Sequence, residues 1–172
     1  MELDAITILR AQLTQAHEMV EFAMTDLSQE HLHHMSEGST IHSIATVYAH
    51  LVQSEDALMN TYVREQPMLF EREGWQDKVG VGYELQFSAL ADAIKSGDID
   101  ALRVYAQSVY FESAEYLATL SESDLDRPVT FGSMGDFPLG IFLGTFVVWQ
   151  AVQHGGEICA LKGCLGGQGL PF

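Results

Sequence analysis

Basic residues are scarce in this chain. Its 172 residues include 8 lysines and arginines against 24 aspartates and glutamates, which gives a formal net charge of -16. So acidic an exterior repels phosphate backbones and anionic lipid headgroups, because like charges oppose close approach. The composition therefore argues against nucleic acid and membrane surfaces as partners, and a well-solvated exterior accounts for the charge.

Long hydrophobic runs are also missing. The longest apolar run, residues 138–152, contains Gly140, Gly144 and Gln150, and it is shorter than the roughly 20 residues that a membrane-spanning helix needs. The first ten residues, MELDAITILR, have no basic region followed by an apolar core, as a secretory signal would. We therefore expect a soluble, cytoplasmic protein.

The chain has two cysteines, Cys159 and Cys164. They are five residues apart within or near one predicted helix, so their side chains point in different directions. This spacing suits a reducing compartment, and we expect buried, apolar thiols rather than a disulfide or a redox pair.

Proline and β-branched alternation are sparse as well. The four prolines, Pro67, Pro128, Pro138 and Pro171, lie between or at the ends of periodic segments. Both features favour an all-α chain. With 47% hydrophobic residues, residues 1–172 are long enough to form a single domain with a buried core.

Apolar residues at steps of three and four predict four long helices. The first covers about residues 3–26, and the second follows a cap at Ser39 or Thr40. The third is capped by Asp98, and the last covers about residues 138–162. Proline at the first turn and glycine at the end are typical of such a final helix.

The connections complete the predicted architecture. Residues 63–82 lack a sustained period, and twenty residues are enough to cross one end of a bundle, so the helices on either side need not be antiparallel neighbours. A short helix is expected over residues 83–95, and residues 121–138 should be irregular, with turns at Gly132 and Gly135. The sequence thus predicts a four-helix bundle with one long crossover and a short extra helix.

A polar stripe interrupts the otherwise apolar last helix. At about 100° per residue, Gln150 and His154 lie about 40° apart and His154 and Glu157 about 60° apart, so the three share one side. Burying these groups together costs several kcal/mol unless they bond each other, a metal or a ligand. The stripe therefore marks a candidate site.

Helical bundles build metal and cofactor sites from facing helices, so His50 on the second helix and His154 on the last are candidates to meet. Glu55 also falls on the core-facing stripe of the second helix. It could accept the second N–H of a metal-ligating histidine. Alternatively, it could pair with His17 or a tyrosine hydroxyl inside the bundle, because a buried carboxylate needs a partner in either case.

Two segments resemble the DinB-like superfamily. SIATVYAHLVQSE, residues 43–55, resembles the second helix of that family, and QHGGEICALKGCLG, residues 153–166, resembles its last helix. The resemblance implies a bundle with a long crossover, commonly a homodimer. It also implies a divalent metal, often zinc or nickel, held by three histidines at one open end. Some members are thiol-dependent transferases or isomerases, and others are presumed hydrolases.

This chain departs from the family pattern at one ligand position. Gln150 stands where the family usually has the first histidine of the last helix, and a neutral amide oxygen is a weaker donor to zinc than imidazole. The predicted ligands are therefore His50, Gln150 and His154. Glu157 is a reserve that would complete a two-histidine, one-carboxylate set, although it lies about 10 Å along the helix from Gln150.

Two functions follow. The first is a divalent-metal-dependent enzyme, a hydrolase or a thiol-dependent transferase, whose metal activates water or a thiol sulfur. The second is a metal-free bundle that binds a small ligand or acts through its dimer surface. The sequence does not identify a substrate. Thiol transfer would need a pocket for an acidic or sugar-bearing thiol, and the few basic residues offer no visible clamp.

Overall fold

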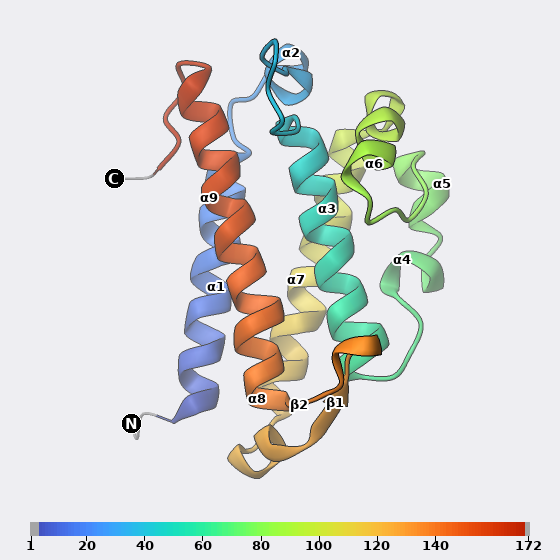
Figure 1. Cartoon of the computed structure of the whole chain (residues 1–172), viewed down its shortest axis with the longest axis vertical. Helices are drawn as coiled ribbons and strands as arrows, with labels where there is room; N and C mark the ends of the chain where they lie inside the picture. The colour runs from blue at the N-terminus through green and yellow to red at the C-terminus, as the bar shows by residue number, and fades with distance from the viewer. Residues whose placement is uncertain (1–3, 171–172) are drawn as a thin grey trace.

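The structure is a computed structural model that describes residues 4–170. Four long helical rods make up its bundle (Figure 1). The first is α1 (Ala5–Ala23), and the second is α3 (Ile44–Asp56), which continues into the π-helical stretch Ala57–Val63. The third is α7 (Ile99–Thr119). The fourth joins α8 (Leu139–Phe142), the π-helical stretch Leu143–Val148 and α9 (Trp149–Cys164). The predicted all-α four-helix bundle is confirmed.

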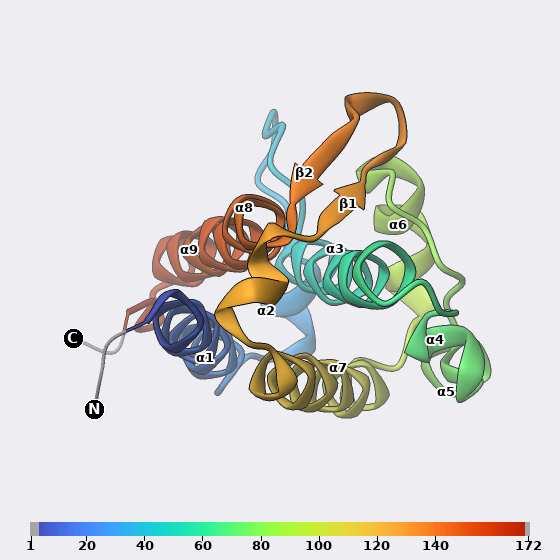
Figure 2. The same cartoon turned by 90° about the horizontal axis from the view of Figure 1, so that it is seen from below.

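The order of the rods is set by the crossover. In Figure 1, α1 and α9 run upward, whereas α3 and α7 both run downward. Viewed along the bundle, α9 lies beside α1 and α3, and α7 lies beside the same two helices (Figure 2). Consecutive long helices α3 and α7 are thus parallel neighbours, which requires a connection that returns along the whole bundle.

The crossover is more ordered than the sequence indicates. It contains α4 (Leu69–Arg72), α5 (Trp75–Val79) and α6 (Phe87–Ala93), of which only the last was predicted as a helix. Gly74 and Gly80 flank α5 with positive φ values of 65° and 73°, a conformation that glycine adopts at little cost. Helices of four and five residues are too short to show a period.

Asp56, at the end of α3, anchors the crossover. Its fully buried carboxylate accepts the backbone N–H groups of Leu69 and Phe70 at 2.9 and 2.8 Å and the Tyr105 hydroxyl at 2.6 Å. It also accepts the Asn60 amide at 2.7 Å. Four hydrogen-bond donors replace the water that this carboxylate loses on burial. It joins α3, α4 and α7 at one point.

The start of α3 differs from the prediction. The cap is Ser43, whose hydroxyl accepts the Thr46 N–H at 3.4 Å, so the predicted cap at Ser39 or Thr40 is wrong. Ser39 instead accepts the N–H of Ile41 at 3.0 Å, a local turn that competes with helix capping. The cap at Asp98 is present, with its carboxylate 2.9 Å from the Ala101 N–H.

Two further elements lie outside the rods. The short helix α2 (Gln29–His33) follows α1. Strands β1 (Pro128–Thr130) and β2 (Asp136–Pro138) form an antiparallel hairpin at the lower end of the bundle, within the segment expected to be irregular. Gly132 and Gly135 in its turn have positive φ, at 52° and 91°. Three-residue strands are too short for a detectable alternation.

Close packing explains one glycine of α9. A Cβ at Gly155 would lie 2.8 Å from Met19 Cε and 3.0 Å from Val20 Cγ2, so α1 approaches α9 closely there. Both cysteines are free, and Cys159 is buried. Cys164 is exposed in the last turn of α9, so the expectation of two buried thiols is wrong for that residue. None of the helices in residues 4–170 is both long and apolar enough to cross a bilayer.

Candidate functional site

Two histidines from facing helices meet inside the bundle. His50 lies on α3 and His154 on α9, and their ring centres are 5.2 Å apart with the planes at 80°. The structure therefore brings together the two side chains that the sequence identifies as candidates to meet. Each comes from a helix that packs directly on the other.

His50 is held in an apolar environment. The Phe87 ring of α6 lies against it, with ring centres 4.1 Å apart. Nε2 is 3.4 Å from the Ser54 hydroxyl, one helical turn on, and the buried Nδ1 has no hydrogen-bond partner among the described residues. Burial, and next the neighbouring His154, lower the pKa of His50 to about 4, with the Leu85 backbone acting in the opposite direction. At neutral pH the ring is uncharged, the form that binds metals.

His154 is oriented by Glu157. A carboxylate oxygen of Glu157 lies 3.0 Å from Nδ1 of His154, one turn earlier on α9. When Nδ1 donates to that oxygen, the lone pair is on Nε2 and the ring is fixed in one tautomer. Carboxylate–histidine pairs of this kind raise the basicity of metal-ligating histidines. Glu157 thus contacts His154 itself, as a partner that orients the ring.

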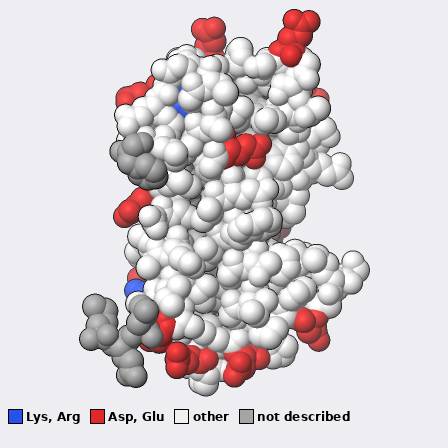
Figure 3. Space-filling model, turned by 60° about the vertical axis from the view of Figure 1, so that its left-hand side comes forward, with Lys and Arg blue, Asp and Glu red and all other residues white. Residues whose placement is uncertain are grey.

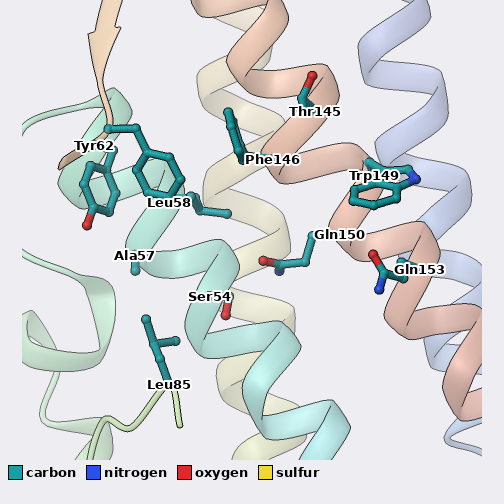
Figure 4. A pocket seen from close by; sticks show the side chains of 11 residues that line it. Ser54, Ala57, Leu58, Tyr62, Leu85, Thr145, Phe146, Trp149, Gln150 and Gln153 are labelled. Atoms are coloured by element: carbon teal, nitrogen blue, oxygen red, sulfur yellow. The ribbon is translucent and has the colours of Figure 1, made fainter. Parts of the chain in front are cut away.

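Gln150 is directed toward α3. Its amide nitrogen donates to the backbone carbonyl of Leu51 at 3.3 Å, and Figure 4 shows the side chain reaching across from α9 toward α3, near Ser54. With the nitrogen engaged there, the amide oxygen is the atom available to a ligand. Gln150 therefore lies next to the helix turn that carries His50 and Ser54.

Glu55 serves a different part of the bundle. Its two carboxylate oxygens lie 2.8 Å from Nε2 of His17 and 2.7 Å from the Ser113 hydroxyl, so it connects α3 to α1 and α7. His17 is buried and stacks on Tyr110 with ring centres 3.8 Å apart. Of the two roles considered for Glu55, the structure has the pairing with His17. The carboxylate is not a partner of His50 or His154.

The donor set has a definite composition. No group of three or more His, Cys, Asp or Glu side chains within residues 4–170 is arranged to hold a metal ion. Two imidazoles and the Gln150 amide oxygen remain. Two imidazoles on one tetrahedral zinc, with bonds of about 2.1 Å, have ring centres roughly 5 Å apart, which agrees with the observed separation. The free Nδ1 of His50 and the carboxylate-oriented His154 also fit this use.

A cavity of about 370 Å³ lies one helical turn from His50 (Figure 4). Ser54, which lines it, is 3.4 Å from Nε2 of His50, whereas neither His50 nor His154 is among its lining residues. Ser54, Ala57, Leu58 and Tyr62 line it from α3 and its π-helical extension. Thr145 and Phe146 line it from the π-helical stretch before α9, and Trp149, Gln150 and Gln153 from α9 itself. Both π-helical stretches therefore border this cavity, in keeping with the frequent occurrence of such turns at functional sites.

Two loops close the cavity. Leu85 comes from the crossover and Phe131 from the turn of the β-hairpin. The Phe131 ring contacts the rings of Tyr62 and Phe146, with centres 4.8 and 4.9 Å apart. The hairpin thus completes an aromatic wall opposite α3.

Apart from Gln150, the residues that line the cavity were not identified from the sequence. Ser54 had a usable signal, because a hydroxyl four residues after His50 lies on the same helix face. Trp149 directly precedes Gln150, but a tryptophan in an apolar helix is normally part of the core. Leu85, Phe87 and Phe131 lie on connections, whose tertiary position is not encoded in any local period.

Comparison with solved structures shows the same fold in bacterial proteins. A conserved protein from Enterococcus faecalis matches with a TM-score of 0.80 and 15% identity, over 96% of this chain and 99% of the other. YfiT from Bacillus subtilis, described as "a probable metal-dependent hydrolase with an unusual four-helix bundle topology", matches with a TM-score of 0.66 and 17% identity, over 94% and 88%. A Streptococcus pneumoniae protein matches at 0.65 and 13%, over 95% and 93%.

Among curated protein sequences, none shows significant similarity to this chain. The model of one protein family, described as the DinB superfamily, matches residues 12–158. That match includes α3, the crossover, α7 and nearly the whole of the rod that carries Gln150 and His154. The chain therefore belongs to the DinB superfamily.

Proposed function

We propose that this protein is a divalent-metal-dependent hydrolase whose metal, zinc or nickel, is held by His50, His154 and, more weakly, the amide oxygen of Gln150. The meeting of the two imidazoles at 5.2 Å carries the proposal. The contact of Glu157 with Nδ1 of His154 supports it, because it leaves Nε2 as the donor atom. The description of the similarly folded YfiT as a probable metal-dependent hydrolase agrees with it.

Each side chain has a defined task in this proposal. His50 is uncharged at neutral pH because its pKa is about 4, so its lone pair is available. Glu157 holds the proton on Nδ1 of His154. The apolar side chains of the cavity wall pack against the substrate. A metal bound there would supply Lewis-acid polarisation and an activated water.

Hydrolysis is favoured over thiol transfer by the charge of the cavity. A thiol cosubstrate that carries an acidic group is an anion, and an anion in a pocket needs a cationic partner. None of the described residues that line the cavity is a lysine or arginine. Water needs no such clamp.

Metal content tests the proposal directly. Protein purified without a histidine tag should contain bound zinc or nickel, and added metal should raise its Tm. His50→Ala and His154→Ala should each abolish that rise. His34→Ala, which removes an exposed histidine of the loop before α3, should retain it. Substoichiometric metal with no metal-dependent rise in Tm would contradict the proposal.

A metal-free ligand-binding protein is the second candidate. It is favoured by the finding that, within residues 4–170, no third His, Cys, Asp or Glu joins the two imidazoles to hold a metal. The apolar cavity itself needs no metal to bind a small ligand. The two candidates differ in one measurement. Binding of a small ligand that persists in chelator, in a protein that takes up no metal, would select the second.

We also infer that two copies of the chain associate through the face formed by α1 and α9. Exposed Val152 lines a groove of about 830 Å³ between the two helices. Ile8 on α1 and Ile141 on α8 are also exposed. Few charged residues occupy the middle of this face (Figure 3). Because each copy has a net charge of -16, two copies approach most easily where charge is sparse.

A further inference from the structure

We propose that the cavity one helical turn from His50 binds an uncharged, apolar group of one to two rings, joined to a neutral amide or ester carbonyl that lies at Ser54 and Gln150. The inference deepens the proposed function, because it names the substrate class that the histidine pair would act on. Binding of the apolar group itself depends only on the cavity.

The charge of the cavity wall is the first argument. Its described lining contains no Asp, Glu, Lys or Arg side chain. Basic residues are few, and six of the eight are engaged elsewhere by hydrogen bonds, an ion pair or a ring contact: Arg64, Arg72, Lys78, Lys95, Arg127 and Lys162. A charged ligand would lose its hydration here without gaining a partner, which costs several kcal/mol. A neutral ligand avoids this cost.

The size and shape of the cavity are the second argument. An apolar cavity of about 150 Å³ is enough for benzene, and this one measures about 370 Å³. Tyr62, Phe131 and Phe146 supply ring faces and edges along its wall, against which an aromatic group packs favourably. One or two rings with a short substituent fill such a space.

The polar atoms are the third argument, because they lie on one side. Ser54 faces the cavity, while its hydroxyl is 3.4 Å from Nε2 of His50, a long contact that leaves the hydrogen free to donate elsewhere. The Gln150 amide lies across from it (Figure 4). A carbonyl oxygen of the ligand accepts a hydrogen bond from the Ser54 hydroxyl. Because Ser54 is 3.4 Å from Nε2 of His50, this hydrogen bond holds the carbonyl on the side of the cavity nearest His50.

The chemistry of such a substrate balances without further reactants. Water adds its hydroxyl to the acyl carbon, the C–N or C–O bond breaks, and the leaving amine or alcohol takes the remaining proton. The acid product ionises at neutral pH. Because the cavity offers no cation, an ionised acid formed there would be released.

Ligand charge provides the test. Wild-type protein in chelator should bind N-benzylacetamide, detected by ligand-observed NMR or Trp149 fluorescence, at least about tenfold more tightly than phenylacetate, which has a similar shape and a negative charge. Leu85→Lys places a cation at the cavity wall. Since Leu85 is 41% exposed, the fold should tolerate the change, and the preference should move toward phenylacetate by tenfold or more.

The matched control is Val104→Lys on α7, a 58% exposed position that does not line the cavity. It should leave the ratio of the two affinities unchanged. Equal binding of both compounds to the wild type, or a ratio that Leu85→Lys does not alter, would overturn the inference. Metal uptake without N-benzylacetamide binding would do so too, while sparing the proposed metal site. Ligand binding in a protein that takes up no metal would reject the metal site alone.

Discussion

The amide at position 150 sets the metal affinity that we expect of this protein. An imidazole is a stronger donor to zinc than an amide oxygen. Gln150→His should therefore bind zinc at least about tenfold more tightly than the wild type in a chelator-competition assay. Gln12→His, on the exposed face of α1, is the control that adds a histidine elsewhere. Unchanged affinity for Gln150→His would show that residue 150 does not face the metal.

His50 should make the stability of the metal-free protein depend on pH. Its pKa falls from 6.5 to about 4 on folding, so the unfolded chain binds more protons than the folded one between those values. Stability from the neutral ring is therefore complete above pH 6.5 and is lost as pH falls toward 4.

His50→Gln removes this titration. In chelator, the drop in Tm between pH 7 and pH 5 should be smaller for His50→Gln than for the wild type. His34→Gln should behave as the wild type. A drop of equal size in His50→Gln would mean that His50 is not desolvated in the folded protein.

For single residues, the sequence predicts which side chains belong to the candidate site better than it predicts which partners they contact. His50 and His154 stand out because polar residues interrupt apolar helix faces, and the structure brings their rings together. Glu157 was considered as a ligand, whereas it bonds to His154. Glu157 lies one helical turn after His154, so its side-chain rotamer decides whether it acts as a metal ligand or contacts His154. Phe87 gave no signal, since its contact with His50 depends on how the crossover folds back.

Among the elements, the crossover depends most on one side chain. Asp56→Ala removes the acceptor for the Leu69 and Phe70 N–H groups and the Tyr105 hydroxyl. Leaving these buried donors unpaired should lower the free energy of unfolding by about 3–5 kcal/mol. Hydrogen exchange should rise first in α4 and α5.

Asp92→Ala is the control, because Asp92 is exposed and pairs only with Lys95. Its effect on unfolding should stay within about 1 kcal/mol. Uniform exchange along Asp56→Ala, without a preference for the crossover, would contradict the anchoring role of Asp56.

Long elements were predictable and short ones were not. A period of three and four repeats several times in α1, α3, α7 and α9, so these helices are visible in the sequence. In contrast, α4, α5, β1 and β2 contain three to five residues each. The π-helical stretches also escape detection, because their side chains stay apolar while the hydrogen bonding changes. The two π-helical stretches supply much of the cavity wall, whereas α4, α5, β1 and β2 do not line it.

For the whole molecule, the acidic surface makes self-association sensitive to salt. If two copies meet through the α1 and α9 face, sedimentation should show a dimer that tightens as salt screens the repulsion between them. Ile8→Glu combined with Val152→Glu places charge on this face, at side chains that are 42% and 44% exposed, and should give a monomer.

Val104→Glu adds the same kind of charge to α7 at a more exposed position, and it should remain dimeric. A wild type that stays monomeric at high salt and high concentration would rule out the homodimer. A dimer that survives the double substitution would place the interface on another face.

The length of one connection was enough to predict the topology of the bundle. Twenty residues without a period between the second and third long helices exceed what a tight helical hairpin needs, and α3 and α7 are indeed parallel neighbours (Figure 2). The partner of each helix was not accessible, because any apolar face can pack against several others. Tertiary contacts determine where α4 and α5 form in the crossover, and therefore where Leu85 lies.

His50 and His154 lie in opposite halves of the polypeptide. Neither half alone therefore contains both histidines that would bind an ion. An ion bound by both rings dissociates when α3 and α9 separate. Its affinity would accordingly add to the cooperativity of global melting, and a fragment ending before α8 would gain nothing from it.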